Sequence, residues 1–104
     1  MTQAELYKEL NSLGLPLAYH HFSTPQTPPY IVYLFSYSSD LIADNQNYKS
    51  ISNFQVELYT TKKDLASEKL IEDKFKSLSI PYLKTELYLE TENLFEVLYE
   101  IKLI

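Results

Sequence analysis

The sequence contains no cysteine, no arginine, no tryptophan and only one glycine. Without cysteine, the chain has no thiol nucleophile, no disulfide and no thiolate metal ligand. Without arginine, it lacks the side chain that most often forms paired hydrogen bonds with phosphates and bases. A single glycine excludes the glycine-rich loops that cradle phosphates. These absences remove cysteine chemistry and the common nucleotide-binding motifs from consideration.

Positive charge is also scarce, because nine lysines stand against 14 acidic residues and give a net charge of −5. An acidic chain without arginine is poorly suited to the phosphate backbone, so we expect no specific nucleic-acid binding. No apolar run approaches the length of a membrane span and no secretory signal pattern is present, so we expect no membrane association. The 104 residues predict one domain, residues 1–104, and the hydrophobic content of 45% is ordinary for a folded protein.

Residues 3–13 are predicted to form a short amphipathic helix. Thr2 and Glu5 have the spacing of a capping box, in which each side chain accepts a hydrogen bond from the other's backbone amide. Three leucines at i, i+4 and i+7 would form one apolar stripe. These leucines are Leu6, Leu10 and Leu13. Gly14 is placed to end the helix, since glycine favours the left-handed conformation found there.

A second helix is predicted from about residue 64 to residue 78, with Asp64 or Thr61 as its N-cap. Its apolar stripe consists of Ile71, Phe75 and Leu78. The charged residues between them are expected to face water, and these are Glu68, Lys69, Glu72 and Lys76. The helix would therefore pack through one face only.

Strands are predicted over residues 17–22, 30–37, 51–59, 82–90 and 94–104, which are rich in aromatic and β-branched residues or alternate between apolar and polar. Residues 82–90 and 94–104 are expected to form a hairpin. Residues 38–50 are polar and are expected to form an exposed loop, in which residues 41–43 are expected to pack or pair with a neighbour. The order α-β-β-β-α-β-β predicts an α+β domain, with a mainly antiparallel sheet and two helices on one face.

The segment "AYHHFSTPQTPP" holds the only histidines, His20 and His21, and three of the five prolines. If residues 17–22 are a strand, the two imidazoles point to opposite faces and cannot share one metal ion. No other metal-ligating side chain lies nearby in sequence, so we expect no metal site. The Pro25-x-x-Pro28 element lacks the flanking basic residue typical of ligands of proline-binding domains. With Pro29 it is expected to be a stiff loop, whose possible role is contact with another protein.

No Ser-His-Asp spacing or His-Glu-x-x-His motif is present, and the glutamates of the predicted strands lie at positions expected to be solvated. We therefore expect no catalytic site and no cofactor. A metal-dependent enzyme centred on His20 is a further alternative, against which the absence of a third ligand nearby argues.

Ten tyrosines are more informative, because tyrosine buries area while keeping a polar tip and is enriched at interfaces. We predict that one outer face of the sheet packs between subunits. The predicted interface residues are Glu57, Tyr59, Glu86 and Tyr88. The polar loop 38–50 is the predicted partner or lumen surface, through Asp40, Asp44, Asn45 and Asn47.

Three stretches together resemble the small tail-completion and tail-terminator proteins of long-tailed phages and prophages of Gram-positive bacteria. They are "PPYIVYLFSYSSD", "FQVELYTTKKDLASEKLIEDKF" and "YLKTELYLETENLFEVLYEIKLI". The resemblance covers most of the chain and lies in the element order, the "VELYT-KKD" junction and the tyrosine-rich final hairpin.

This resemblance implies a structural, non-enzymatic role in virion assembly, at the head-tail junction of the virion and in the host cytoplasm beforehand. Members of the family form rings, often hexamers, that cap the tail tube and join it to the head connector. The expected partners are thus further copies of the chain, the tail-tube protein and the head-connector protein. The alternative is a small cytoplasmic protein-binding module or regulator without catalytic activity, which would remain monomeric or dimeric.

Overall fold

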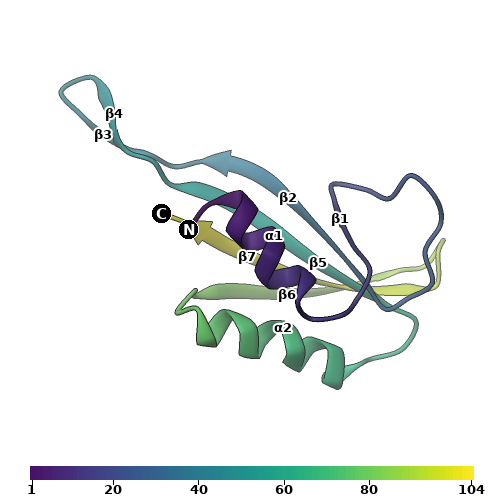
Figure 1. Ribbon diagram of the computed structural model, residues 1–104. Helices are drawn as coiled ribbons and strands as arrows, with labels where there is room; N and C mark the ends of the chain where they lie inside the picture. Colours follow the sequence, from purple (N-terminus) through teal and green to yellow (C-terminus); the bar gives the residue numbers. More distant parts are fainter.

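The computed structural model describes all residues from Met1 to Ile104. Two helices and seven strands follow one another along the chain (Figure 1). They are α1 (Gln3–Asn11), β1 (Leu17–Tyr19), β2 (Tyr30–Ser38), β3 (Leu41–Ala43), β4 (Gln46–Lys49), β5 (Ser52–Thr60), α2 (Leu65–Ser77), β6 (Tyr82–Leu89) and β7 (Leu94–Leu103).

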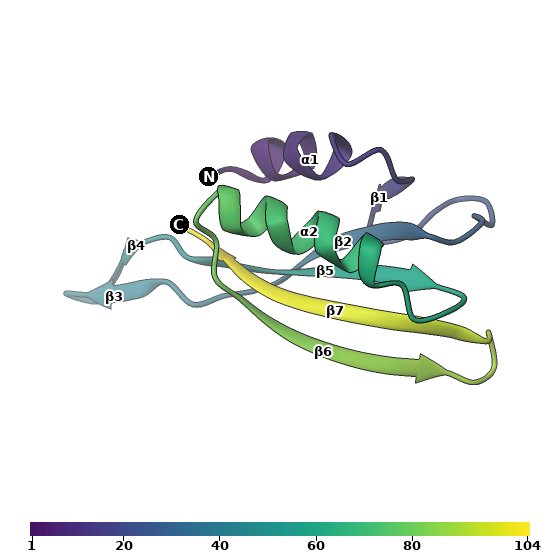
Figure 2. The same cartoon turned by 90° about the horizontal axis from the view of Figure 1, so that it is seen from below.

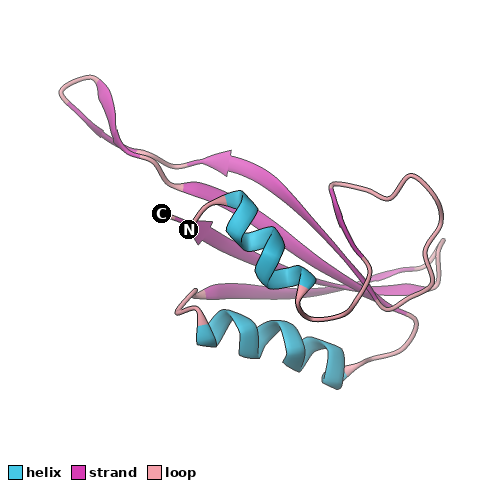
Figure 3. Ribbon diagram, viewed as in Figure 1, coloured by secondary structure: helices cyan, strands magenta, loops and turns pink.

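Five of the strands form one sheet in the order β1-β2-β5-β7-β6. All neighbours in this sheet are antiparallel except β1 and β2, which are parallel. Both helices lie on the same side of the sheet, and no helix covers the other side, which we call the open face (Figures 2 and 3). The predicted α+β class, with two helices on one face of a mainly antiparallel sheet, is confirmed.

The core lies between the helices and the sheet. It contains every second residue of β5 and β7, in agreement with the predicted alternation of these strands. Its largest fully buried side chains are Tyr99, Phe75, Leu6, Leu10, Ile31, Leu58, Ile71, Val56 and Val97. Removing apolar area of this kind from water is the main term that stabilises such a domain.

Both helices begin where their caps predict. At α1, Thr2 Oγ1 accepts from the amide of Glu5 at 3.1 Å, and Glu5 Oε1 accepts from the amide of Thr2 at 3.0 Å, so the predicted capping box is present. At α2, Asp64 is the N-cap and accepts from both the amide and the hydroxyl of Ser67. Gly14 has a φ of 82°, the conformation expected for it at the end of α1.

The predicted loop 38–50 contains a short hairpin. Strands β3 and β4 pair with each other as a separate two-stranded sheet that projects beyond the end of the main sheet (Figure 1). Asp44 and Asn45 join them with φ values of 52° and 61°, as a two-residue hairpin turn requires. All residues from 41 to 49 are exposed, as predicted, and we call this segment the arm.

Two predictions of side-chain direction on the helix side are wrong. Glu68 and Glu72 of α2 do not face water, since Glu68 is only 2% exposed and both bind lysines of the structure. On β6, the tyrosine and charged positions face the helices, and the leucines face away. Both differences have the same cause: Lys84 of β6 lies under α2 and pairs with both glutamates.

Candidate interaction surfaces

The two histidines lie in a turn, because β1 ends at Tyr19, three residues before the predicted end of the strand. The amide of His20 donates to the carbonyl of Tyr33 at 2.8 Å, and the chain then turns away with a φ of 69° at His20. Histidine is among the residues that tolerate this conformation. The imidazoles are therefore not on opposite faces, and their centroids lie 5.6 Å apart. No group of three or more metal-ligating side chains occurs in the structure.

The proline segment forms a wide loop between β1 and β2 (Figure 3). Pro25 is exposed, whereas Pro28 and Pro29 are half-buried. Pro29 lines a small cavity of about 300 Å³ together with the turn at residues 60–64. The loop is anchored by Phe22, which packs edge-on against Tyr30 with centroids 5.4 Å apart. Its assignment as a contact loop stays a prediction.

The four residues predicted to form one subunit interface lie on two faces of the sheet. Glu86 pairs in register with Val97, which is buried under the helices, so Glu86 and Tyr88 lie on the helix side of β6. Glu57 and Tyr59 of β5 lie on the open face. A single flat interface through all four side chains is therefore wrong. The alternation along β6 divides its residues into two sets, one for each face of the sheet, but does not indicate which set faces the helices.

A charged network joins α2 to β6, the strand at one edge of the sheet. Lys84 Nζ lies 2.6 Å from Glu68 Oε1 and 2.7 Å from Glu72 Oε2. Tyr82 and Tyr99 also donate to Glu72, at 3.3 and 2.7 Å. Burial acts to raise the pKa of Glu68 and Glu72, but these hydrogen bonds outweigh it and hold both pKa values below the usual range. No buried side-chain nitrogen or oxygen here lacks a hydrogen-bond partner, as is typical of a network that stabilises the fold.

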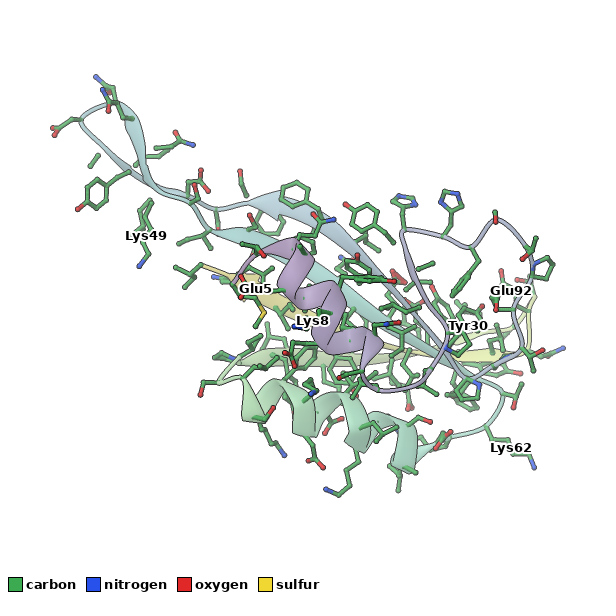
Figure 4. The ribbon with its side chains drawn as sticks, in the orientation of Figure 1. Glu5, Lys8, Tyr30, Lys49, Lys62 and Glu92 are labelled. Carbon is green, nitrogen blue, oxygen red and sulfur yellow. The ribbon has the colours of Figure 1, made fainter.

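The open face carries a second group, made of carboxyls and aromatic rings, at the end near the proline loop. Tyr59 donates to Glu57 Oε2 at 2.7 Å and stacks on Tyr30 with centroids 5.1 Å apart. Glu96, opposite Tyr59 in the register, is half-buried beside Glu57. Burial, a hydrogen bond with Glu57 and the negative charges of Glu57 and Glu92 raise the pKa of Glu96 to about 7. Figure 4 shows Tyr30 and Glu92 at this end of the molecule.

The arm presents apolar side chains with few neighbours of their own. Leu41, Ile42 and Tyr48 are 53%, 73% and 79% exposed. Its base is held more firmly, because Asp40 accepts from the side-chain amide of Asn47 at 2.9 Å and from the amide of Ile51 at 2.8 Å. Of the four predicted partner-surface residues, Asp40 and Asn47 thus stabilise the arm, whereas Asp44 and Asn45 lie at its tip. The prediction that residues 41–43 pack or pair with a neighbour is confirmed, since they pair with β4. Tyr48 was not predicted as part of this surface, although an aromatic residue within a polar segment was a usable signal.

A shallow groove of about 510 Å³ crosses the open face near the base of the arm. It runs from β2 across β5 and β7 to β6, and its floor includes Leu83, which is 69% exposed. The lining residues used below are Tyr37, Gln55, Leu83, Glu100, Lys102 and Ile104. An exposed leucine flanked by other apolar side chains is typical of an interaction surface. The structure therefore has two separate apolar surfaces without a partner in their own chain, the arm and the groove.

The comparisons with known proteins give no relatives: no family model matches the chain and no curated protein is similar to it. Neither helix of the structure has the length and apolar character needed to cross a bilayer.

Proposed function

We propose that this protein is a structural subunit of a phage or prophage tail, a tail-completion, tail-terminator or head-tail joining protein that assembles into a ring. The ring would cap the tail tube and join it to the head connector, without catalytic activity. Its resemblance to such proteins motivates the proposal, and six copies are expected from the same resemblance.

The observation that carries the proposal is the presence of two different unpartnered surfaces on one chain. The arm projects from one end of the molecule, and the groove crosses the open face. When unlike surfaces of identical subunits bind each other, the contact either repeats head-to-tail and closes into a ring if the rotation allows, or is made twice in a reciprocal dimer. Two unlike surfaces therefore provide what a ring needs, and the resemblance favours the ring over the reciprocal dimer.

Charge provides separate support. The net charge of −5 and the absence of arginine suit a channel through which DNA passes without being held. A regulator that binds a single protein partner does not need an acidic chain without arginine, although such a chain is compatible with that role.

Solution mass tests the proposal. We expect sedimentation or light scattering at high protein concentration, alone and with the tail-tube protein of the same phage, to detect one closed oligomer. Negative-stain images of that species should show rings. A chain that stays monomeric under both conditions would contradict the proposal, and a monomer or dimer that captures one protein partner would favour the non-catalytic binding module instead.

A further inference from the structure

The arm is not a self-sufficient element. A two-stranded hairpin alone is marginally stable in water, and this one has only three and four residues in its strands. Three of its side chains, Leu41, Ile42 and Tyr48, are apolar and more than half exposed. Its turn and its base are nevertheless well formed, through the positive φ values at Asp44 and Asn45 and the bonds to Asp40. A formed hairpin with exposed apolar side chains indicates a binding element that a partner covers.

The groove is complementary to the arm in its apolar residues. It offers Leu83, Tyr37 and Ile104 as apolar contacts, and each of these is more than half exposed. It lies on a sheet face that no helix covers (Figure 2). The arm of the same chain cannot fill it, because the arm leaves the sheet directly after Ser38 and continues away from it (Figure 1). Any occupant of the groove therefore comes from another molecule.

The charges of the two surfaces also match. The arm carries Lys49 at its base and Asp44 at its tip, and the groove carries Glu100 and Lys102 on β7. None of these four side chains forms an ion pair within the chain. In Figure 4 the Lys49 side chain extends away from the ribbon of the arm. One positive and one negative group on each surface allow two complementary pairs, which fix the direction in which an arm can lie.

We propose that the arm of one copy docks in the open-face groove of a second copy. Ile42 and its neighbours cover Leu83, Lys49 approaches Glu100, and Asp44 approaches Lys102. A second copy is the occupant that the structure favours, because each chain supplies both surfaces with matching apolar and charged groups. This inference rests on the proposed ring and names the contact that would build it.

The absence of cysteine allows a direct test. One chain carries Ile42→Cys and a size tag, and a second chain carries Leu83→Cys without a tag. Mixed under mild oxidation, they should form the tagged–untagged disulfide dimer about tenfold faster than a control pair, because docking raises the effective concentration of the two thiols. The control replaces Leu83→Cys with Leu70→Cys, an exposed leucine on α2 and on the opposite side of the molecule. Circular dichroism of each variant checks that the fold is retained.

A chain carrying both Ile42→Cys and Leu83→Cys separates this inference from the proposed function. A ladder of cross-linked species ending in a closed oligomer supports both. Cross-linked dimers alone support the arm contact but contradict the ring, since two copies would then exchange arms reciprocally. Oligomers in solution whose cysteines react no faster than the control pair leave the ring intact and overturn the arm contact. Monomers at millimolar concentration without accelerated cross-linking also overturn the arm contact. It is likewise overturned if the thiol introduced by Ile42→Cys becomes less reactive only when a different protein is added.

Discussion

At the scale of single residues, Glu96 is the side chain whose ionisation links the open face to pH. Its pKa is raised from 4.5 to about 7 by burial and by the neighbouring Glu57 carboxyl and Glu92 charge. The folded protein therefore holds a proton that the unfolded chain has lost over this pH window. The contribution of Glu96 to the free energy of unfolding falls as the pH rises from about 4.5 to about 7 and stays at the lower value above it.

We predict that Glu96→Gln makes the protein more stable at pH 8, by about 1 to 2 kcal/mol after allowance for solvent screening. The difference from the unmodified protein should shrink towards pH 5, where Glu96 of the folded protein is protonated. Denaturant unfolding at several pH values measures both effects. Glu100→Gln is the matched control, since Glu100 lies on the same strand and face opposite Gln55. A gain that is equal at pH 5 and pH 8 would contradict the assigned cause.

Lys84 is the residue on which the charged network depends. Lys84→Met leaves Glu68, which is 2% exposed, with Lys63 as its only cation, and leaves Glu72 with tyrosine hydroxyls alone. Removing one partner of a buried pair costs about 3 to 5 kcal/mol, and partial exposure of Lys84 reduces this to about 2 to 4. Lys69→Met removes an exposed pair with Asp73 and is the matched control, which should leave the free energy of unfolding nearly unchanged.

The pH dependence of the Lys84→Met variant provides a second measurement. Hydrogen bonds from the lysines hold the pKa values of Glu68 and Glu72 low, so their contribution to stability is present above the unfolded pKa and is lost as the pH falls through the folded pKa. The deficit of the variant should thus be largest near neutral pH and smaller in acid. A deficit that is constant from pH 7 to pH 4 would indicate lost packing of the lysine side chain instead.

At the scale of elements, the arm and the body are predicted to be energetically independent. The amide of Ser39 donates to the carbonyl of Ile51 at 2.9 Å, so Asn-Gly in place of residues 40–50 would close β2 and β5 with a two-residue turn. We expect the free energy of unfolding to change by less than about 1 kcal/mol, since a shorter loop offsets the lost bond to Asp40. Assembly should be abolished, as measured by solution mass.

A full-length variant controls for the loss of the hairpin itself. Threonine at positions 41, 42 and 48 keeps β propensity while removing the apolar side chains of the arm. It should fold normally and also fail to assemble. If arm removal lowers the unfolding midpoint strongly, the arm packs on its own body, and the independence argued here is wrong.

The elements also indicate what sequence alone could and could not predict. The capping box at Thr2 and the alternation of Phe54, Val56 and Leu58 depend on local chemistry and single-face burial, and both were confirmed. On β6 the same alternation was ambiguous, because one set was leucine and the other tyrosine, lysine and glutamate. Only the tertiary placement of Lys84 beneath Glu68 and Glu72 decides which set faces α2.

The candidate surfaces were predicted only in part for the same reason. Segment 38–50 was predicted to be exposed because it is polar. The exposure of its three large apolar residues follows only from the hairpin, which holds them away from the body. The groove brings together residues from β2, β5, β6 and β7, so no local pattern could contain it. The strand ending at Tyr19 was missed because the turn at His20 has no glycine or proline to mark it.

At the scale of the whole molecule, the arm gives the chain its elongated form, with principal extents of 49 × 29 × 24 Å. An extended contact element on a small body allows subunits to hold each other without enlarging the sheet. In a ring, such arms would bridge neighbours while the bodies remain free to face the channel and the adjoining rings.

Net charge leads to the last prediction, that the assembled protein does not retain duplex DNA. Nonspecific binding needs several phosphate contacts from lysine or arginine, whereas this chain has a charge of −5 and no arginine. Fluorescence anisotropy with a labelled duplex at about 150 mM salt should give no dissociation constant tighter than about 10⁻⁴ M. Lowering the salt concentration should increase the affinity for DNA only slightly, because the repulsion between the acidic protein and the phosphates also strengthens as screening decreases. Micromolar binding that weakens steeply with salt would contradict a channel that lets DNA pass, because each copy added to the ring would then add another site of retention.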